Sequence, residues 1–311
     1  MSVLVTGAAV LDILLSAPPE LPAPGASRLI DTIALAAGGC GVNTAIGLAR
    51  LGVSVKFAAH LGADGAGEWI RAELGRAGVG LDHFRQSAEV ATKSAVVLLS
   101  ASGERSFLRT PGGGNAIARA DLEHLDWSGI SHLHIGGCYS LRRLLGTDLA
   151  AVLRSARLAG VATCLDTVWS SDGNWEALLP ALGQIDHLLP SLTEARAITG
   201  ESTPQAMARW FIAHGSTRVV IKLGERGAYA LGPDIDAVVP ALPVPGGRVV
   251  DTTGAGDAFC AGYLAALTAG LAPPQAVRWA NAWGAVAVSG LGAIAALRDR
   301  SQLAALLALT G

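Results

Sequence analysis

The segment VVDTTGAGDAF, residues 249–259, combines a strand-like apolar run, a turn of small residues and the start of a long apolar helix. We expect this helix to begin near Asp257, which would leave the backbone N–H groups of Gly254, Ala255 and Gly256 without intrahelical partners. The helix dipole adds positive potential at that end, and small side chains let a ligand approach the backbone closely. The segment is therefore typical of a site for an anion such as a phosphate group.

Asp257 has two interpretations. As an acidic residue in the first turn of a helix, it would only stabilise that helix through the dipole. As a carboxylate beside an anion site, it would accept a proton from a hydroxyl that attacks a phosphoryl group. The chain has no GxxxxGKS/T phosphate loop, and glycine clusters 62–67 and 112–114 lack the strand–GxGxxG–helix setting of a dinucleotide site. A nucleotide would have to bind in another way.

The composition of the 311-residue chain indicates a globular protein with closely packed helices and strands. Apolar residues make up 51% of the chain, enough for a large core, whereas charged residues make up 15% and aromatic residues 5%. The 39 glycines suit close packing of helices on a sheet. The net charge of −2 supplies no large positive field, so a nucleic-acid partner is not expected.

The cysteines and the apolar segments bear on location. The four cysteines form no CxxC pair and no cluster with histidine, so we expect reduced core thiols rather than a zinc site or disulfides. They are Cys40, Cys138, Cys164 and Cys260. No basic region precedes the first apolar run, which Asp12 interrupts, and the uncharged segment 279–297 contains polar residues and glycines. We expect a cytoplasmic protein without a membrane partner.

Strand-like and helix-like segments alternate along most of the chain, which predicts an α/β fold with a doubly wound, mostly parallel sheet flanked by helices. The expected strands are 2–5, 53–59, 132–135, 162–166, 187–189 and 218–222. The expected helices are 44–52, 69–77, 144–159, 193–198, 204–214, 258–269, 274–289 and a last helix from 301, and a hairpin-like stretch covers 228–239.

Two segments depart from this alternation. Residues 13–37 contain four prolines and a modest strand, and residues 85–110 contain a hairpin of strands 94–99 and 105–109 around Ser102-Gly103-Glu104. We expect these two segments to form a small β-sheet lid. The core would then comprise residues 1–12, 38–84 and 111–311.

Two motifs resemble those of the ribokinase-like (PfkB) carbohydrate kinases. The first runs from Asp251 to Asp257 and continues with Ala258-Phe259 and Gly262, and the second is the glycine motif 38–45 with Leu51-Gly52 after it. Their order and separation match the family, and the likeness spans nearly the whole chain. The further matching points are Gly7 with Asp12, Gly62-Ala63-Asp64 with Gly67, Gly103-Glu104-Arg105, Asp166, Lys222-Leu223-Gly224 with Gly227, Asn281, and Gly292-Ala293.

The resemblance implies a doubly wound core with a β lid and an ATP-dependent transfer of phosphate to a hydroxyl of a sugar or sugar-like molecule. Asp257 would be the general base, and the amides of Gly254, Ala255 and Gly256 would form the anion hole. The implied substrate-binding residues are Asp12, Gly39, Asn43 and Asp257, and the lid could add Arg109. The implied nucleotide-binding residues are Lys222, Gly224, Gly227, Thr253, Gly254, Gly256 and Asn281.

Several of these residues also have ordinary structural interpretations. Asp12 could cap a local turn, and Asn43 could be a helix N-cap, because both residue types favour such positions. Lys222 could be a solvated strand end, Asn281 an amide on a helix surface, and Arg109 an exposed lid residue. These alternatives stay open at the level of the sequence.

The resemblance also implies metal ions. Magnesium is expected because the triphosphate charge must be neutralised during transfer. The family often carries Asn-x-x-Glu near the phosphates, whereas this chain reads Ser191-Leu-Thr-Glu194. We expect Glu194 to act on Mg²⁺ indirectly, with weaker or rearranged support from Ser191. Some relatives bind a monovalent cation such as K⁺, for which Asp251 and Thr253 are candidates with the loop 289–292.

The sequence does not identify the molecule that accepts the phosphate. Several relatives place an acidic residue after the strand 132–135, where this chain has Gly136-Gly137-Cys138. Arg109 would suit an acidic sugar such as a ketodeoxygluconate. The alternatives are a nucleoside or vitamin-alcohol kinase, or a catalytically silent sensor of sugars or nucleotides; a dehydrogenase is not supported, since residues 6–11 lack a dinucleotide fingerprint. Apolar lid strands predict a homodimer formed through the lid.

Overall fold

The computed structural model describes residues 1–18, 20–99, 105–110 and 115–309. The expected hairpin turn Ser102-Gly103-Glu104, the glycine cluster 112–114 and the matching pair Gly103-Glu104 lie outside the described residues. Within these ranges, no helix has the length and apolarity that crossing a membrane requires.

A large sheet of nine described strands forms the centre of the molecule. Its order is β13-β12-β11-β10-β9-β8-β1-β4-β5, and only the β11–β12 and β12–β13 pairs are antiparallel. The strands are β1 (Ser2–Gly7), β4 (Val55–Gly62), β5 (Phe84–Ser87), β8 (Ile130–Gly136), β9 (Ala162–Leu165), β10 (His187–Leu188), β11 (Arg218–Lys222), β12 (Ala228–Gly232) and β13 (Ile235–Val239). The predicted mostly parallel sheet is confirmed.

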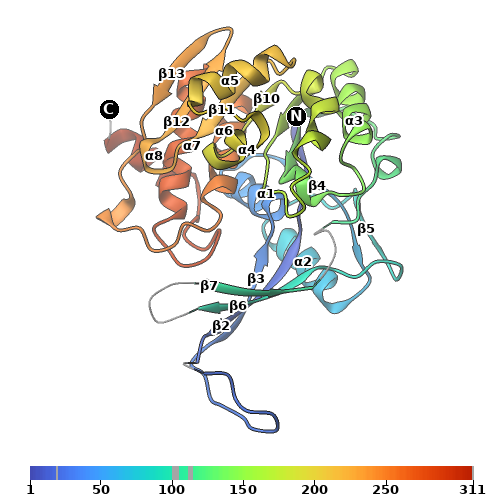
Figure 1. Cartoon of the computed structure of the whole chain (residues 1–311), viewed down its shortest axis with the longest axis vertical. Helices are drawn as coiled ribbons and strands as arrows, with labels where there is room; N and C mark the ends of the chain where they lie inside the picture. Colours follow the sequence, from blue (N-terminus) through green and yellow to red (C-terminus); the bar gives the residue numbers. More distant parts are fainter. Residues whose placement is uncertain (19, 100–104, 111–114, 310–311) are drawn as a thin grey trace.

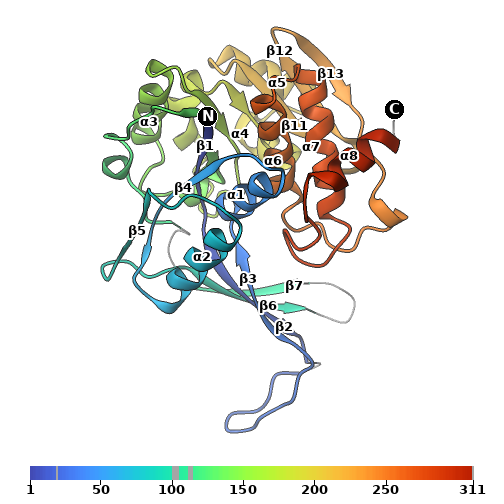
Figure 2. The same ribbon diagram turned by 180° about the vertical axis from the view of Figure 1, so that it is seen from behind.

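Helices cover both faces of this sheet, as Figures 1 and 2 show from opposite sides. Consecutive residues of a strand point to opposite faces, so Val3 and Val5 pack in one apolar cluster and Leu4 in another. The first cluster includes residues of α1 (Cys40–Arg50), α2 (Gly65–Arg76), α6 (Ala255–Thr268), α7 (Pro273–Ala287) and α8 (Arg300–Leu309). The second includes residues of α3 (Thr147–Leu158), α4 (Leu192–Thr199) and α5 (Pro204–Ala213). The doubly wound arrangement is thereby confirmed.

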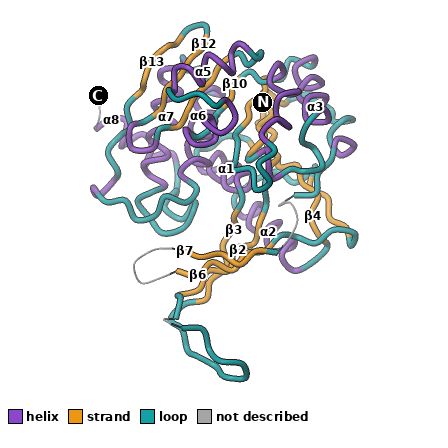
Figure 3. Tube along the Cα trace, viewed as in Figure 1, coloured by secondary structure: helices purple, strands orange, loops and turns teal. Residues whose placement is uncertain are grey.

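A smaller sheet lies apart from the large one, at the lower end of the view in Figure 3. Its order is β3-β2-β6-β7, with β2 (Val10–Ser16), β3 (Ile33–Gly38), β6 (Ser94–Leu99) and β7 (Arg105–Arg109). β2 runs parallel to β6, and the other two pairs are antiparallel. The loop between β2 and β3 extends away from the body of the protein in both Figure 1 and Figure 2.

The limits of several elements differ from the expected ones. β2 begins at Val10, so Asp12 lies in the smaller sheet rather than in the core segment 1–12. β5 belongs to the large sheet, although residues from 85 onward were expected in the lid. The helices α1 and α6 begin at Cys40 and Ala255, directly after glycines with left-handed or otherwise positive φ, and so start a few residues earlier than predicted.

His134 is buried in the large sheet without hydrogen-bond partners among the described residues. Its side chain is 0% exposed, and neither Nδ1 nor Nε2 has a partner. It stands in register with Val5 of β1 and Cys164 of β9. Burial, reinforced by the charge of Lys222, lowers the pKa of His134 to about 3. The folded protein therefore holds this imidazole neutral where an unfolded chain would bind a proton.

We expect the free energy of unfolding to fall as pH decreases from about 6.5, the ordinary pKa of an unfolded histidine, toward 3. The folded pKa is depressed, so this stability is present above the unfolded pKa and is lost below it. Each proton taken up only by the unfolded state costs about 1.4 kcal/mol per pH unit. Urea denaturation at several pH values should show a shallower decline for His134→Phe, while the exposed control His124→Phe keeps the wild-type slope. Equal slopes for all three proteins would contradict the prediction.

Candidate functional site

The turn before α6 brings its first backbone amides to the surface of a cavity. Gly254 has φ 71°, a left-handed conformation that only glycine adopts readily. A Cβ at this position would lie 2.5 Å from the carbonyl oxygen of Ala293. The N–H of Ala255 donates to the Thr252 carbonyl at 3.3 Å, so one of the three amides predicted to be unpaired has a long hydrogen bond. Among the described residues, no acceptor pairs with the N–H of Gly254 or Gly256.

The loop ahead of this turn is tied to a second loop near residue 290. Asp251 accepts hydrogen bonds from the N–H of Thr253 at 3.0 Å and from the N–H of Gly292 at 2.7 Å. The two segments expected to hold a monovalent cation are therefore adjacent. The carboxylate of Asp251 itself accepts hydrogen bonds from backbone N–H groups of both loops.

Asp257 joins the N-terminal ends of α6 and α1. Its side chain is buried, and its Oδ2 accepts a 2.7 Å hydrogen bond from Nδ2 of Asn43. Thr44 donates to the backbone carbonyl of Asp257 at 3.3 Å. Burial raises the pKa of Asp257, while hydrogen bonds from Asn43 and Cys40 and the charge of Lys222 oppose the rise. The predicted residues Asn43 and Asp257 thus form one unit, although they are far apart in sequence.

A buried ion pair lies beside Asp257. Nζ of Lys222, at the end of β11, donates to Oδ1 of Asp166, directly after β9, at 2.6 Å. Burial alone would lower the pKa of Lys222, but the carboxylate of Asp166 outweighs it and raises that pKa. One ligand atom each of Cys40, Asp166 and Asp257 lies within 4.8 Å of the other two. Cys40 had no predicted role, because a cysteine inside a glycine motif carries no signal of its own.

Glu194 and Ser191 form the N-terminal cap of α4. The Ser191 hydroxyl accepts from the N–H of Glu194 at 3.3 Å, and Oε2 of Glu194 accepts from the N–H of Ser191 at 3.0 Å. Oε2 also accepts from the hydroxyl of Thr167 at 2.7 Å. The charge of Glu194 acts on both Asp257 and Lys222. The Ser191 hydroxyl is therefore engaged in the helix cap.

A cavity of about 710 Å³ opens beside the first turn of α6. Five residues predicted to bind nucleotide line it, whereas Thr253 and Gly254 do not. The five are Lys222, Gly224, Gly227, Gly256 and Asn281. Much of the remaining wall is apolar and includes Leu242, Pro243, Val244, Phe259 and Val288, which sequence reasoning missed because such residues look like ordinary core. The size and the mixed lining suit a small-molecule ligand.

Asn281 reaches the cavity but uses its amide within the protein. Its Nδ2 donates to the carbonyls of Val239 and Pro240, each at 3.0 Å. The side chain thereby holds the chain after β13 against α7. Asn281 is 7% exposed, so the alternative of a solvated surface amide is wrong.

The predicted residues of the smaller sheet lie on one of its faces. Asp12, Ala95 and Arg109 stand in register across β2, β6 and β7 and so point to the same side. A Cβ on Gly38 would lie 2.2 Å from Oδ2 of Asp12, which places this carboxylate against the glycine turn that leads to α1. The exposed guanidinium of Arg109 lies 4.5 Å from the ring centroid of Phe107.

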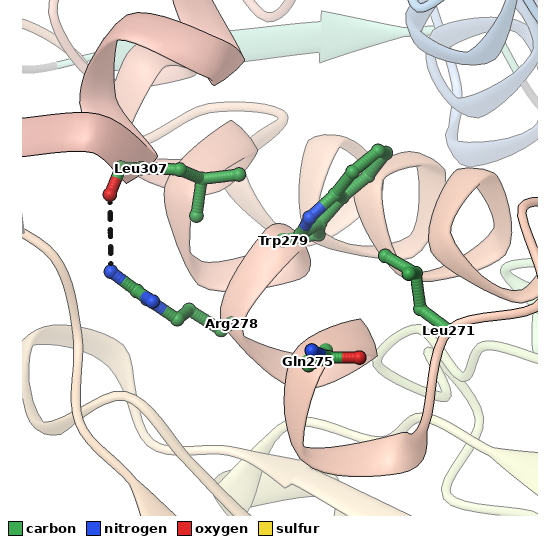
Figure 4. A pocket seen from close by; sticks show the side chains of 5 residues that line it. All are labelled: Leu271, Gln275, Arg278, Trp279 and Leu307. Atoms are coloured by element: carbon green, nitrogen blue, oxygen red, sulfur yellow. Dashed lines mark hydrogen bonds between the residues drawn. The ribbon is translucent and has the colours of Figure 1, made fainter. Parts of the chain in front are cut away.

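A second cavity, of about 210 Å³, lies between α7 and α8 (Figure 4). It is lined by Leu271, Gln275, Arg278, Trp279 and Leu307, and Arg278 donates to the Leu307 carbonyl at 3.1 Å. None of the predicted site residues lines it. The larger cavity is therefore the candidate site.

Comparison with known proteins agrees with this geometry. The model of the pfkB family of carbohydrate kinases matches residues 2–300. The chain is 28% identical over 294 residues to the 2-dehydro-3-deoxygluconokinase of Bacillus subtilis (strain 168), covering 91% of this chain and 90% of the relative. It is 32% identical over 286 residues to the aminoimidazole riboside kinase of Salmonella typhimurium, covering 86% of each chain.

Solved structures show the same arrangement. The ribokinase of Arabidopsis thaliana complexed with ribose and ATP superposes with a TM-score of 0.81 at 28% identity, and the match covers 98% of both chains. The likeness in sequence and the likeness in fold thus extend over nearly the same residues. The chain therefore belongs to the pfkB family of carbohydrate kinases, and the predicted class of enzyme, an ATP-dependent carbohydrate kinase, is confirmed.

Proposed function

We propose that the protein transfers the γ-phosphoryl group of ATP to a hydroxyl of a sugar or sugar-like molecule, with Asp257 as general base. The observation that supports this most directly is the position of Asp257. It lies in the first turn of α6, held by Asn43 at 2.7 Å, beside a cavity of about 710 Å³. A carboxylate fixed next to an amide-lined anion site can accept the proton of an attacking hydroxyl.

The environment of Asp257 suits a base. Burial raises its pKa from the ordinary range, which strengthens it as a proton acceptor, while the Asn43 and Cys40 hydrogen bonds stabilise the ionised form. The bond from Asn43 also restricts the rotation of the carboxylate. The base is thereby oriented before a substrate arrives, which reduces the cost of reaching the reactive geometry.

The amides at the start of α6 would stabilise charge on the transferred group. The N–H groups of Gly254 and Gly256 supply donors, and the helix dipole adds to them. The Ala255 amide can contribute once its 3.3 Å bond to Thr252 gives way to a stronger acceptor. Lys222 lies close to Gly256, because a Cβ on that glycine would be 3.3 Å from Nζ. Its ammonium can thus reach a phosphate at this turn.

The large cavity would hold the nucleotide, with Lys222, Gly224, Gly227 and Asn281 along it. The residues nearby fit a magnesium ion, since Asp166 and Glu194 offer the carboxylate oxygens that this ion prefers. Glu194 would act through water, because its Oε2 already accepts from Thr167 and Ser191. Bound magnesium would neutralise phosphate charge during transfer.

A monovalent cation such as K⁺ would use backbone carbonyls where the loop of Asp251 and Thr253 meets Gly292.

The acceptor would bind between the smaller sheet and α1. Asn43 is 4% exposed, and its Oδ1 has no hydrogen-bond partner among the described residues, so it can accept from a substrate hydroxyl. Asp12 would bind further hydroxyls, and Gly39 would let the substrate approach the backbone. The smaller sheet would act as a lid over this space.

A nucleoside acceptor is the second candidate, since the Salmonella typhimurium relative is an aminoimidazole riboside kinase.

ADP release in the presence of ATP, Mg²⁺ and a panel of sugars, sugar acids, sugar phosphates and nucleosides tests the proposal. An acceptor-dependent signal supports a kinase. The absence of any signal with every acceptor would contradict it.

Replacing the base should separate turnover from nucleotide binding. We expect Asp257→Asn to lower kcat by roughly 10²–10⁴-fold, the usual contribution of a general base, because asparagine keeps the shape and can still accept from Asn43. ATP affinity, measured by calorimetry, should change little. The exposed control Asp148→Asn should keep full activity. A variant at position 257 with near-normal kcat would refute the assignment.

Gly254 and Gly270 have nearly the same backbone conformation but different surroundings, so they form a matched pair for substitution. Gly254→Ala places a Cβ 2.5 Å from the Ala293 oxygen at φ 71°, whereas Gly270→Ala meets nothing within 4 Å at φ 72°. Both variants suffer backbone strain of about 1–2 kcal/mol. Only Gly254→Ala should displace the anion-binding turn, and we expect it to lower kcat/KM by about 10²-fold or more in the ADP-release assay. Equal losses in both variants would show that strain alone is responsible.

A homodimer through the smaller sheet is also proposed. Leu35, Ile13, Val96 and Leu108 stand in register on the face opposite Asp12 and Arg109, and Leu35 and Leu108 are 48% and 63% exposed. An apolar sheet face of this kind favours association. We expect light scattering to give a dimer for the wild type and a monomer for Leu108→Asp. The control Leu158→Asp, at an exposed position of α3, should stay dimeric; a monomeric wild type would refute the dimer.

A further inference from the structure

The face of the smaller sheet that carries Asp12 also carries two cations. Arg109 stands in register with Asp12 through Ala95. Lys93 precedes Ala95 by two residues, and its carbonyl continues the strand pairing by accepting from the N–H of Leu11 at 3.0 Å. Residues two apart in an extended chain point to the same side. Lys93, Arg109 and Asp12 therefore share one face.

A third cation, Arg142 of the core, acts on Lys93 through its charge. Burial lowers the pKa of Lys93, the charges of Arg109 and Arg142 lower it further, and Asp12 opposes them. Arg109, Arg142 and Asp12 are therefore each close enough to Lys93 for their charges to act on it. Arg142 follows β8, where the chain has Gly136-Gly137-Cys138 and no acidic residue. Positive charge thus exceeds negative charge around Asp12.

The three cations differ in whether an acidic side chain lies within ion-pair distance of them. Arg142 is close to Asp172, at 3.5 Å, and donates to the Ser171 hydroxyl at 3.1 Å. In the part of the chain that the structure describes, neither Lys93 nor Arg109 has an ion-pair partner. A half-buried ammonium beside like charges is unfavourable unless an anion binds it. Neutral hydroxyl groups would not relieve this repulsion, whereas a bound anion would.

We propose that the acceptor carries an anionic group, which Lys93 and Arg109 bind while Asp257 takes the proton of its reacting hydroxyl. The group is a carboxylate in a sugar acid or a phosphate in a sugar phosphate, since both present oxygens that match these donors. The inference rests on the proposed function and narrows its substrate. Asp12 would bind hydroxyls beside the anion, and Lys93 and Arg109 do not line the cavity proposed for the nucleotide.

The first experiment compares matched acceptors in the ADP-release assay: 2-dehydro-3-deoxygluconate and gluconate, fructose 6-phosphate, and neutral fructose and ribose. We expect kcat/KM for one anionic class to exceed that for the neutral sugars by about tenfold to hundredfold, the range that charged hydrogen bonds contribute. The preferred class identifies the anion as carboxylate or phosphate. Efficient turnover of neutral sugars alone would overturn the inference and leave the kinase proposal standing; no turnover with any acceptor would overturn both.

The second experiment removes the charges. Lys93→Met and Arg109→Gln should each raise KM for the anionic acceptor about tenfold or more, with KM for ATP unchanged and the preference for anions reduced. Arg109→Lys should recover part of the loss, and Lys56→Met, a lysine paired with Asp82 outside the site, should behave as wild type. A rise in KM for ATP instead would show that these cations serve the triphosphate and would overturn the inference. Arg109 is exposed, so its variants keep the test valid if Lys93→Met fails to fold.

Discussion

The hydrogen bond from Asn43 to Asp257 connects the two helix ends on which the site is built. α1 begins after the Gly38-Gly39 turn that contacts Asp12, and α6 begins after Gly254, next to Ala255 and Gly256, which line the large cavity. A buried carboxylate is costly without such partners, so the bond from Asn43 stabilises both the ionised side chain and the contact between the helices. The proposed acceptor side and the proposed phosphate side are thereby kept in one geometry.

Negative charge exceeds positive charge around this bond. Asp257, Asp166 and Glu194 bring three carboxylates near one ammonium, that of Lys222. The Lys222–Asp166 ion pair and the helix cap that engages Glu194 stabilise part of this negative charge. The negative potential that remains would suit a divalent ion bound with the nucleotide. The smaller sheet shows the opposite imbalance, because Lys93 and Arg109 exceed Asp12. Under the proposed function, the two sides would select ligands of different charge.

Much of the architecture could be predicted from residue patterns, because buried parallel strands are apolar and alternate with amphipathic helices. The strand at Val10–Ser16 was missed, since Asp12 interrupts its apolar run. Asn43 and Asp257 could be named from their motifs, but their contact depends on tertiary packing. The apolar cavity wall at Leu242 and Phe259, and the thiol of Cys40, could not be anticipated, since such residues look like core in any sequence.

The attachment of the chain after β13 has a consequence for how this enzyme can diversify. Asn281 holds the carbonyls of Val239 and Pro240, and the following residues, among them Leu242 and Val244, form part of the cavity wall. This wall is a peripheral strap, separate in sequence from the turn at Gly254 and from Asp257. If this cavity holds the nucleotide as proposed, substitutions in the strap would alter which nucleobase is accommodated without moving the groups at the phosphate. Preference for the phosphate donor and the chemistry of transfer would then evolve independently.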